Sequence, residues 1–328
     1  MANARQFHTS TLLENGTVLV VGGTSSRGDL ASVERYDSAS NRWHAASPLA
    51  TARYYHSATL LNTGCVLVAG GFNGSYLRNA ELYDPISDRW RSAGAMRVSH
   101  GLHSATLLLD GTVLLAGGYS DRGELNVAES FNPVHNAWHP APALSVGRAH
   151  HTATRLMDRT VLLVAGSSAA GSVASAEIYD VANDQWGPGP SLLHHRMRHT
   201  ATLLGNGRVL VVAGDDGACN YLTHAELYDP DSRRWLAAGN LRSGREYCTA
   251  TRLAGDRVLI AGGDGSTGRL ASCEIYDTVD NTWHPTASLS EARYLHTATT
   301  LADGRVLIAG GVGANGALAS AEIFVLAT

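Results

Sequence analysis

A short apolar run that ends in small residues recurs seven times along the chain. The first reads Gly16-Thr-Val-Leu-Val-Val-Gly-Gly23, and the runs end 47 to 49 residues apart. Before each run stands a segment in which polar and apolar residues alternate, such as HTSTLL at 8–13. Alternation is typical of a half-buried β-strand, and a short continuous apolar run is typical of a fully buried one. The pattern therefore predicts the same pair of strands seven times. The runs end at residues 23, 71, 118, 167, 215, 263 and 311.

Turn residues separate the two strands of each pair, and two further strands follow. Steps such as ENGT (14–17) and LDGT (109–112) favour tight hairpins, because glycine adopts positive φ without strain. A variable loop then leads to a run of the type Glu-x-Tyr-Asp, and a turn leads on to a tryptophan. Each repeat thus predicts four antiparallel strands and no helix, which is the pattern of a propeller blade. The tryptophans are Trp43, Trp90, Trp138, Trp186, Trp235 and Trp283.

The repeated residues resemble those of the kelch-repeat family. Their order is Arg-x-x-His-[Ser/Thr]-Ala-Thr, a glycine-ended strand, a Glu-x-Tyr-Asp strand and a tryptophan, and it extends over essentially the whole chain. The resemblance implies an all-β fold, a seven-bladed β-propeller, and we expect a single domain over residues 1–328. No tryptophan strand follows Glu322, so we expect a last blade of three strands. Only residues 1–4 precede the first repeat, so this blade should close by packing alone, unless the chain is part of a longer one.

Composition and charge argue against several classes of protein. A net charge of −4 does not suit a protein that follows the phosphates of a nucleic acid. No apolar run reaches the roughly 20 residues that span a bilayer, and residues 1–11 lack the apolar core of a secretory signal. We therefore expect a cytoplasmic monomer that binds neither nucleic acid nor membrane. The four cysteines, which show neither metal-type spacing nor a disulfide framework, are Cys65, Cys219, Cys248 and Cys273.

The order of strands predicts where binding takes place. Because successive antiparallel strands alternate in direction, the loops after the second strands and the links between blades lie at the same end. That end is the mouth of the central channel. The turns at the other end are short and repetitive. Since binding residues are commonly held on loops by a rigid scaffold, we expect a small polar molecule or a protein segment to bind at the mouth.

Six repeated histidines on the first strands are candidate metal ligands, but their repetition favours an architectural role. Imidazoles gathered around a channel would suit a metal ion. A residue found at the same position of nearly every blade is explained more simply by hydrogen bonds that hold neighbouring blades together. We therefore expect no metal and no other cofactor. The histidines are His8, His56, His103, His151, His199 and His296.

Departures from the repeat indicate the candidate site. Asp215 and Asp216 stand where most blades have glycines, and Cys248 replaces the repeated histidine. Carboxylates, imidazoles, guanidinium groups and tyrosines around one mouth would suit the anchoring of a polar ligand or acid–base chemistry. The candidate ligand-binding residues are Tyr55, His100, His150, His194, Arg196, Arg198, Asp215, Asp216 and Tyr294, and the candidate catalytic residues are Glu246, Tyr247 and Cys248.

Three functions remain open. The kelch resemblance implies recognition through the mouth. A metal-independent isomerase or cyclase would need two groups with separated pKa values, and Glu246 and Tyr247 could take part. A copper-radical oxidase is the third, because RYYH at 53–56 and Tyr247-Cys248 resemble its ligand segments, although Tyr294 is one residue out of step. A buried, inert thiol is the alternative to a reactive Cys248.

Overall fold

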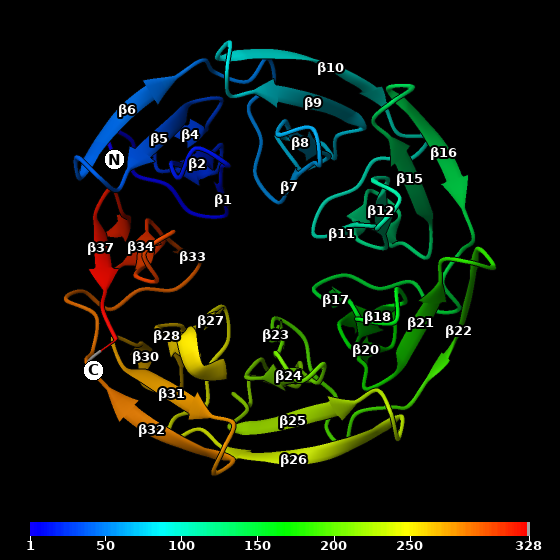
Figure 1. Ribbon diagram of the computed structural model, residues 1–328, viewed down its shortest axis with the longest axis vertical. Helices are drawn as coiled ribbons and strands as arrows, with labels where there is room; N and C mark the ends of the chain where they lie inside the picture. The colour runs from blue at the N-terminus through cyan, green and yellow to red at the C-terminus, as the bar shows by residue number, and fades with distance from the viewer. Residues whose placement is uncertain (327–328) are drawn as a thin grey trace. The chain divides into compact units, whose positions relative to one another are not determined.

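The computed structural model describes residues 1–326, and in them the fold is all-β (Figure 1). Contacts divide the chain into two compact units. Unit 1 comprises Met1–Ala141 with Leu295–Thr328, and unit 2 comprises Pro142–Tyr294. Six four-stranded sheets and one three-stranded sheet within the described residues form the seven blades of a β-propeller, which confirms the predicted fold class. The single domain over residues 1–328 stays a prediction, and its last two residues lie outside the description.

Unit 1 holds blades 1, 2, 3 and 7, and each follows the predicted order of strands. Neighbouring strands pair antiparallel, so that Leu12 lies opposite Val18 across the first hairpin. The strands of unit 1 are β1 (Thr9–Leu12), β2 (Val18–Val21), β5 (Val33–Asp37) and β6 (Arg42–Ala46) in blade 1; β7 (Ser57–Leu60), β8 (Val66–Ala69), β9 (Asn79–Asp84) and β10 (Arg89–Ala95) in blade 2; β11 (Ser104–Leu107), β12 (Val113–Ala116), β15 (Ala128–Asn132) and β16 (Ala137–Ala141) in blade 3; and β33 (Thr297–Thr300), β34 (Val306–Ala309) and β37 (Ala321–Phe324) in blade 7.

Unit 2 holds blades 4, 5 and 6 in the same arrangement. One difference from the predicted pattern is a short 3-10 helix, η1 (Ala254–Asp256), which forms the first turn of blade 6 with Gly255 at a φ of 70°. No helix in the described part of the chain is long and apolar enough to cross a membrane. The strands of unit 2 are β17 (Thr152–Arg155), β18 (Val161–Val164), β21 (Ala176–Asp180) and β22 (Gln185–Gly189) in blade 4; β23 (Thr200–Leu203), β24 (Val209–Val212), β25 (His224–Asp229) and β26 (Arg234–Asn240) in blade 5; and β27 (Thr249–Arg252), β28 (Val258–Ala261), β31 (Cys273–Asp277) and β32 (Thr282–Thr286) in blade 6.

The core lies between neighbouring blades of each unit. The apolar run of every blade is its second strand, and all four residues of that strand are buried. Its side chains point alternately to the two faces of the sheet, so each blade contributes to the packing on both sides. One cluster, for example, joins Leu19 and Val21 of blade 1 to Val66 and Val68 of blade 2. This explains why the second strand reads as a continuous apolar run while the first one alternates.

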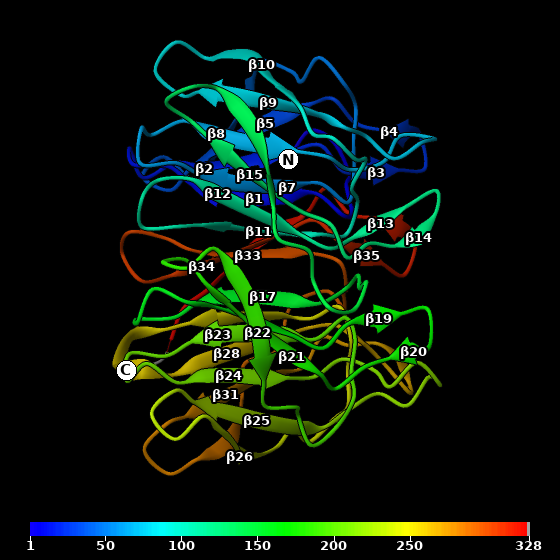
Figure 2. The same cartoon turned by 90° about the vertical axis from the view of Figure 1, so that its right-hand side faces the viewer.

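The variable loops and the links between blades lie at the same end of each blade, as the order of strands predicted. The evidence is a bridge between the link and the residue that follows the second strand, as between Tyr54 and Phe72 or Glu246 and Asp264. We call this end the mouth end. Figure 2 shows the small hairpins of blades 1 and 3 projecting on one side of unit 1. The hairpin strands are β3 (Thr24–Ser25) with β4 (Gly28–Asp29), β13 (Tyr119–Ser120) with β14 (Gly123–Glu124), β19 (Ser167–Ser168) with β20 (Gly171–Ser172), β29 (Asp264–Gly265) with β30 (Gly268–Arg269), and β35 (Val312–Gly313) with β36 (Gly316–Ala317).

A buried arginine joins blade 2 to the blade before it. Its backbone belongs to blade 1, since the Arg53 N–H donates to the Leu30 carbonyl at 3.2 Å and the Arg53 carbonyl accepts from the Gly23 N–H at 2.9 Å. Its guanidinium turns into blade 2, where it donates to the Gly70 carbonyl at 2.7 Å and pairs with Glu81 at 2.7 Å. The equivalent pairs are Arg5–Glu34, Arg148–Glu177, Arg196–Glu226 and Arg245–Glu274, with His100–Glu129 in blade 3.

Repeated histidines and tryptophans add hydrogen bonds between blades, as their repetition predicted. The Trp90 indole of blade 2, for instance, donates to the Ser47 carbonyl of blade 1 at 2.7 Å. The imidazoles reach hydroxyl groups on the first strand of the preceding blade. These pairs are His8 with Thr297 at 3.0 Å, His56 with Thr9 at 3.0 Å, His103 with Ser57 at 2.9 Å and His199 with Thr152 at 2.9 Å.

Blade 7 has three strands, as predicted, but it does not close onto blade 1 by packing alone. The Arg5 N–H donates to the Leu318 carbonyl at 3.0 Å, and the Gly311 N–H donates to the Arg5 carbonyl at 2.9 Å. These are the same backbone bonds that Arg53 makes between blades 1 and 2. The repeated arginine therefore joins blade 7 to blade 1 through backbone hydrogen bonds, which was not evident from the sequence.

Replacing Arg53 with alanine should destabilise the protein by about 3–5 kcal/mol, because Glu81 would keep a buried charge without its cation. The measurement is urea unfolding followed by tryptophan fluorescence. The exposed Arg89 of the same blade provides the matched control, and Arg89→Ala should change the free energy of unfolding by less than about 0.5 kcal/mol. Equal effects of the two substitutions would show that the buried pair does not hold the junction.

Candidate functional site

One residue in every blade has a left-handed backbone at the mouth end. It directly precedes the repeated histidine, or Cys248 in blade 6, and its φ lies between 49° and 58°. Non-glycine residues rarely adopt this conformation, so the surrounding fold must hold it in place. In unit 2, the N–H of Arg198 donates to the His150 carbonyl at 3.2 Å, and the N–H of Tyr247 lies 3.4 Å from the Arg198 carbonyl. The seven residues are Phe7, Tyr55, Leu102, His150, Arg198, Tyr247 and Leu295.

Two carboxyl groups and one guanidinium meet at the mouth end of unit 2. Nη1 of Arg198 donates to Oε2 of Glu246 at 2.9 Å and lies 3.4 Å from Oδ2 of Asp215. The side chains of Asp215 and Glu246 are only 3% and 11% exposed, whereas that of Arg198 is 31% exposed. We call these three residues the carboxyl cluster. None of them is part of the repeat, so the cluster is not required by the architecture.

The surroundings of Glu246 favour its protonated form. Burial raises the pKa of Glu246 to about 7, and a hydrogen bond with Asp215 contributes to the rise, although Arg198 opposes it. A protonated Glu246 donates to the neighbouring carboxylate and avoids the repulsion of two adjacent negative charges. The cluster therefore offers a hydrogen-bond donor and an acceptor side by side, which is the requirement for acid–base work.

Neutral and aromatic groups surround the carboxyl cluster. Burial lowers the pKa of His150 to about 4, and Arg198 adds to the effect, so this imidazole is neutral at pH 7. The ring of Tyr247 lies 6.1 Å from that of His150, and the guanidinium carbon of Arg198 lies 5.3 Å from the Tyr247 centroid. Tyr294 follows at 6.4 Å from Tyr247. A ligand here would meet flat apolar faces as well as charge.

Two further side chains beside the cluster were missed by the sequence analysis. Tyr221 belongs to the variable loop of blade 5, and its hydroxyl lies 3.5 Å from Oδ2 of Asp264. The sequence analysis expected Asp215 in the place of a glycine, but the structure aligns Gly214 with Gly263 and Asp215 with Asp264, directly after the glycines. Comparison of these equivalent positions would have identified Asp264, since carboxylates occupy the position in both blades.

Six of the predicted residues thus lie in or around the carboxyl cluster, and three others are buried away from it. Arg196 and His100 are fully buried, and their side chains pair with Glu226 and Glu129 at junctions between neighbouring blades, so we exclude both from the candidate site. Burial raises the pKa of Cys248 to about 11, so its thiol is protonated at neutral pH and does not suit a nucleophile. The six residues that the fold brings together are His150, Arg198, Asp215, Glu246, Tyr247 and Tyr294.

The remaining predicted residues have other surroundings. His194 stacks on His224 with ring centroids 4.1 Å apart. Asp216 accepts hydrogen bonds from Asn220 and from the backbone of its own loop, so its carboxylate is used in a turn. Tyr55 lies in unit 1, where it packs against Phe7. Whether a residue repeats or departs from the repeat did not distinguish these three positions from those of the carboxyl cluster.

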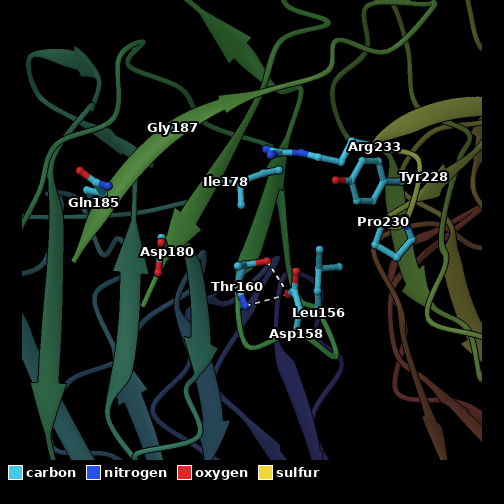
Figure 3. A pocket seen from close by; sticks show the side chains of 10 residues that line it. All are labelled: Leu156, Asp158, Thr160, Ile178, Asp180, Gln185, Gly187, Tyr228, Pro230 and Arg233. Carbon is cyan, nitrogen blue, oxygen red and sulfur yellow. Dashed lines mark hydrogen bonds between the residues drawn. The ribbon is translucent and has the colours of Figure 1, made fainter. Parts of the chain in front are cut away.

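A cavity of about 280 Å³ lies between blades 4 and 5, among turns remote from the mouth end (Figure 3). Its Asp158 carboxylate accepts from the N–H and hydroxyl of Thr160, and its Asp180 carboxylate accepts from Asn183. These carboxylates stabilise their own turns. A similar groove lies between the turns of blades 1 and 2. We therefore attribute both cavities to the packing of neighbouring blades. The lining residues are Leu156, Asp158, Thr160, Ile178, Asp180, Gln185, Gly187, Tyr228, Pro230 and Arg233.

Comparison with known proteins agrees with the fold. A family model described as Kelch motif matches residues 15–50, 52–97, 101–145, 196–242 and 247–290. A novel fungal alcohol oxidase with catalytic diversity among the AA5 family, in complex with copper, has a TM-score of 0.79 at 18% identity, over 96% of this chain and 73% of that chain. The structure of YjhT has a TM-score of 0.68 at 16% identity, over 87% and 98%. Identities this low show a shared fold alone. No curated protein sequence matches the chain.

The pKa of Glu246 is directly testable by carbon NMR, and we expect its carboxyl resonance to titrate with a midpoint near pH 7. Because the folded pKa lies above the unfolded value of about 4.3, the folded state binds more protons between these two pH values. The free energy of unfolding should therefore fall as the pH rises from 5 to 8. Glu246→Gln should reduce this dependence, whereas the exposed Glu14→Gln should not. A midpoint below pH 5 would contradict the shared proton.

Proposed function

Because the chain belongs to the kelch-repeat family, we propose that it is a recognition scaffold that binds a small polar molecule at the carboxyl cluster of unit 2. The observation that carries this proposal is the contact of Arg198 with both Asp215 and Glu246. These side chains come from three different links and loops at the mouth end. The blades supply the rigid frame, and the non-repeated residues supply the chemistry.

The charges of the carboxyl cluster favour an uncharged ligand with hydroxyl or amide groups. Arg198 already interacts with two carboxyl groups, so a ligand carboxylate would have to compete with both. A ligand oxygen can replace Asp215 as the acceptor of the Glu246 proton, and Asp215 can then accept from a ligand hydroxyl. Tyr247 provides an apolar face beside them. A small molecule suits this site better than a protein segment, because the polar groups are concentrated in a few adjoining residues.

An acid–base enzyme is the second candidate, and the raised pKa of Glu246 favours it. A group that titrates near neutral pH can give up and recover a proton during one catalytic cycle. Such an isomerase would move a proton from a carbon of its substrate to Glu246 or Asp215 and return one to a different position. The tyrosyl hydroxyl of Tyr247 is a further group for proton transfer.

The third function left open, a copper-radical oxidase, stays a prediction. Nε2 of His56 is hydrogen bonded to Thr9 in unit 1, and Cys248 belongs to the buried core of unit 2. Within residues 1–326, no group of three or more His, Cys, Asp or Glu side chains is arranged to hold a metal ion. The copper of the fungal alcohol oxidase is a property of that protein.

Isothermal titration with erythritol, urea and N-acetylasparagine amide, which are uncharged and contain no sugar ring, tests the recognition proposal. We expect saturable binding of at least one of them, weakened at least tenfold by Asp215→Asn or Arg198→Gln, which is about 1.4 kcal/mol or more. Asp121→Asn, on the exposed mouth end of unit 1, is the matched control and should leave the affinity unchanged. Absence of binding by all three compounds, or binding unaffected by both cluster variants, would refute the assigned site.

Proton NMR of the bound compound in D₂O separates recognition from catalysis. An acid–base isomerase would replace a carbon-bound hydrogen of its substrate with deuterium, and Glu246→Gln should abolish this exchange. Tyr247→Phe should slow exchange if the hydroxyl takes part. Binding without exchange in the unmodified protein would leave recognition as the whole function of the cluster.

A further inference from the structure

Aromatic side chains have two kinds of location in this fold. The tryptophan of each fourth strand packs against a tyrosine or phenylalanine of the third strand in its own blade. Outside these pairs, Phe324 lies in β37, and three tyrosines adjoin the carboxyl cluster. The remaining six gather at the mouth end of unit 1, and we call them the aromatic cluster. They are Phe7, Tyr54, Tyr55, Phe72, Tyr76 and Tyr119.

The aromatic cluster is continuous. Phe7 lies 4.4 Å from Tyr55 between ring centroids, and Tyr54 connects this pair to Phe72 at 5.5 Å. Tyr76 continues the series at 4.9 Å from Phe72 and leads on to Tyr119 at 5.9 Å. All six side chains are half-buried, so each keeps part of its surface open to solvent. The rings come from links and variable loops of three successive blades, which makes one surface from separate parts of the chain.

The architecture does not require aromatic residues at these positions. Tyr54 pairs with Phe72 in blade 2 as Met197 pairs with Asp215 in blade 5. The same positions thus accept charged residues in another blade without loss of the fold. Partly exposed aromatic surface is unfavourable in water, and a contiguous patch of it is characteristic of a binding site.

We propose that the aromatic cluster is a second binding site, and that it binds the ring of a saccharide. A sugar ring has an apolar C–H face that can lie on an aromatic ring, and it has hydroxyl groups at its edge. Four tyrosines in the cluster provide hydroxyl groups for that edge, and the two phenylalanines provide purely apolar faces. This site lies in unit 1, shares no residue with the carboxyl cluster, and does not rest on the function proposed above.

Two other ligand classes fit the aromatic cluster less well. Nucleotides carry negative charge, whereas the carboxylates of Asp29 and Asp121 act on Tyr54 and Tyr76 and add to the effect of burial in raising the tyrosine pKa values. An alkylammonium ion is held best between several rings. Neighbouring rings here are already in contact with one another, so no ammonium group fits between them, and a ligand must lie on the surface of the cluster.

The test is titration of the full chain with maltohexaose and with cellohexaose, followed by calorimetry and by saturation-transfer NMR. We expect saturable binding of at least one oligosaccharide with transfer to its C–H protons. Phe72→Ser and Tyr76→Ser should each weaken binding at least tenfold, and Tyr76→Phe, which keeps the ring, should weaken it less. Thermal unfolding of each variant shows whether it is folded.

Two variants of unit 2 serve as controls. Tyr221 occupies in blade 5 the place that Tyr76 occupies in blade 2, and Tyr221→Ser should leave oligosaccharide binding unchanged. Asp215→Asn should also leave it unchanged, which separates this site from the carboxyl cluster. The proposal is overturned if neither oligosaccharide binds, if folded Phe72→Ser binds as the unmodified protein does, or if AMP or tetramethylammonium binds at the aromatic cluster and the sugars do not.

Discussion

The buried pair of arginine and glutamate is the interaction on which the rest of the structure depends. Removing a guanidinium from water is costly, and the cost is offset only when every donor finds a well-placed acceptor. The Arg53 side chain donates to Glu81 and to three backbone carbonyls, those of Thr51, Gly70 and Asn79. Glu81 also accepts from the N–H groups of the incoming link. The pair thus fixes the path of the link. Since the left-handed residue follows two positions later, the same contacts determine where Tyr55 lies.

The fold was predictable because the repeat shows its periodicity directly. Apolar runs, glycine turns and tryptophans recur at one spacing, and each has a local physical reason. The candidate site was predictable only in part. Departure from the repeat led to the candidate residues Asp215 and Glu246, but at His100 it reflects a different side chain with the same structural role. Sequence does not separate these cases, because the distinction depends on burial and on the carbonyl groups nearby.

The aromatic cluster illustrates a second limit. Its members come from distant parts of the chain, and only the pairing of links with loops brings Tyr54 to Phe72. The local sequence does not predict a left-handed backbone at Phe7 or Tyr55, because neither is a glycine or an asparagine. The conformation results from hydrogen bonds to neighbouring blades. Long-range contacts of this kind determine which side chains lie together on the surface, whereas the periodic pattern determines the fold of the scaffold.

The left-handed residues have a consequence for how such a protein can change. Phenylalanine, tyrosine, leucine, histidine and arginine all occupy this position with nearly the same φ. The conformational cost, roughly 1–2 kcal/mol for a non-glycine residue, is therefore part of the frame and is nearly independent of the side chain. Exchange of one side chain for another at the mouth leaves folding largely unaffected. New specificities can arise there one blade at a time, by single substitutions, without compensating changes elsewhere in the chain.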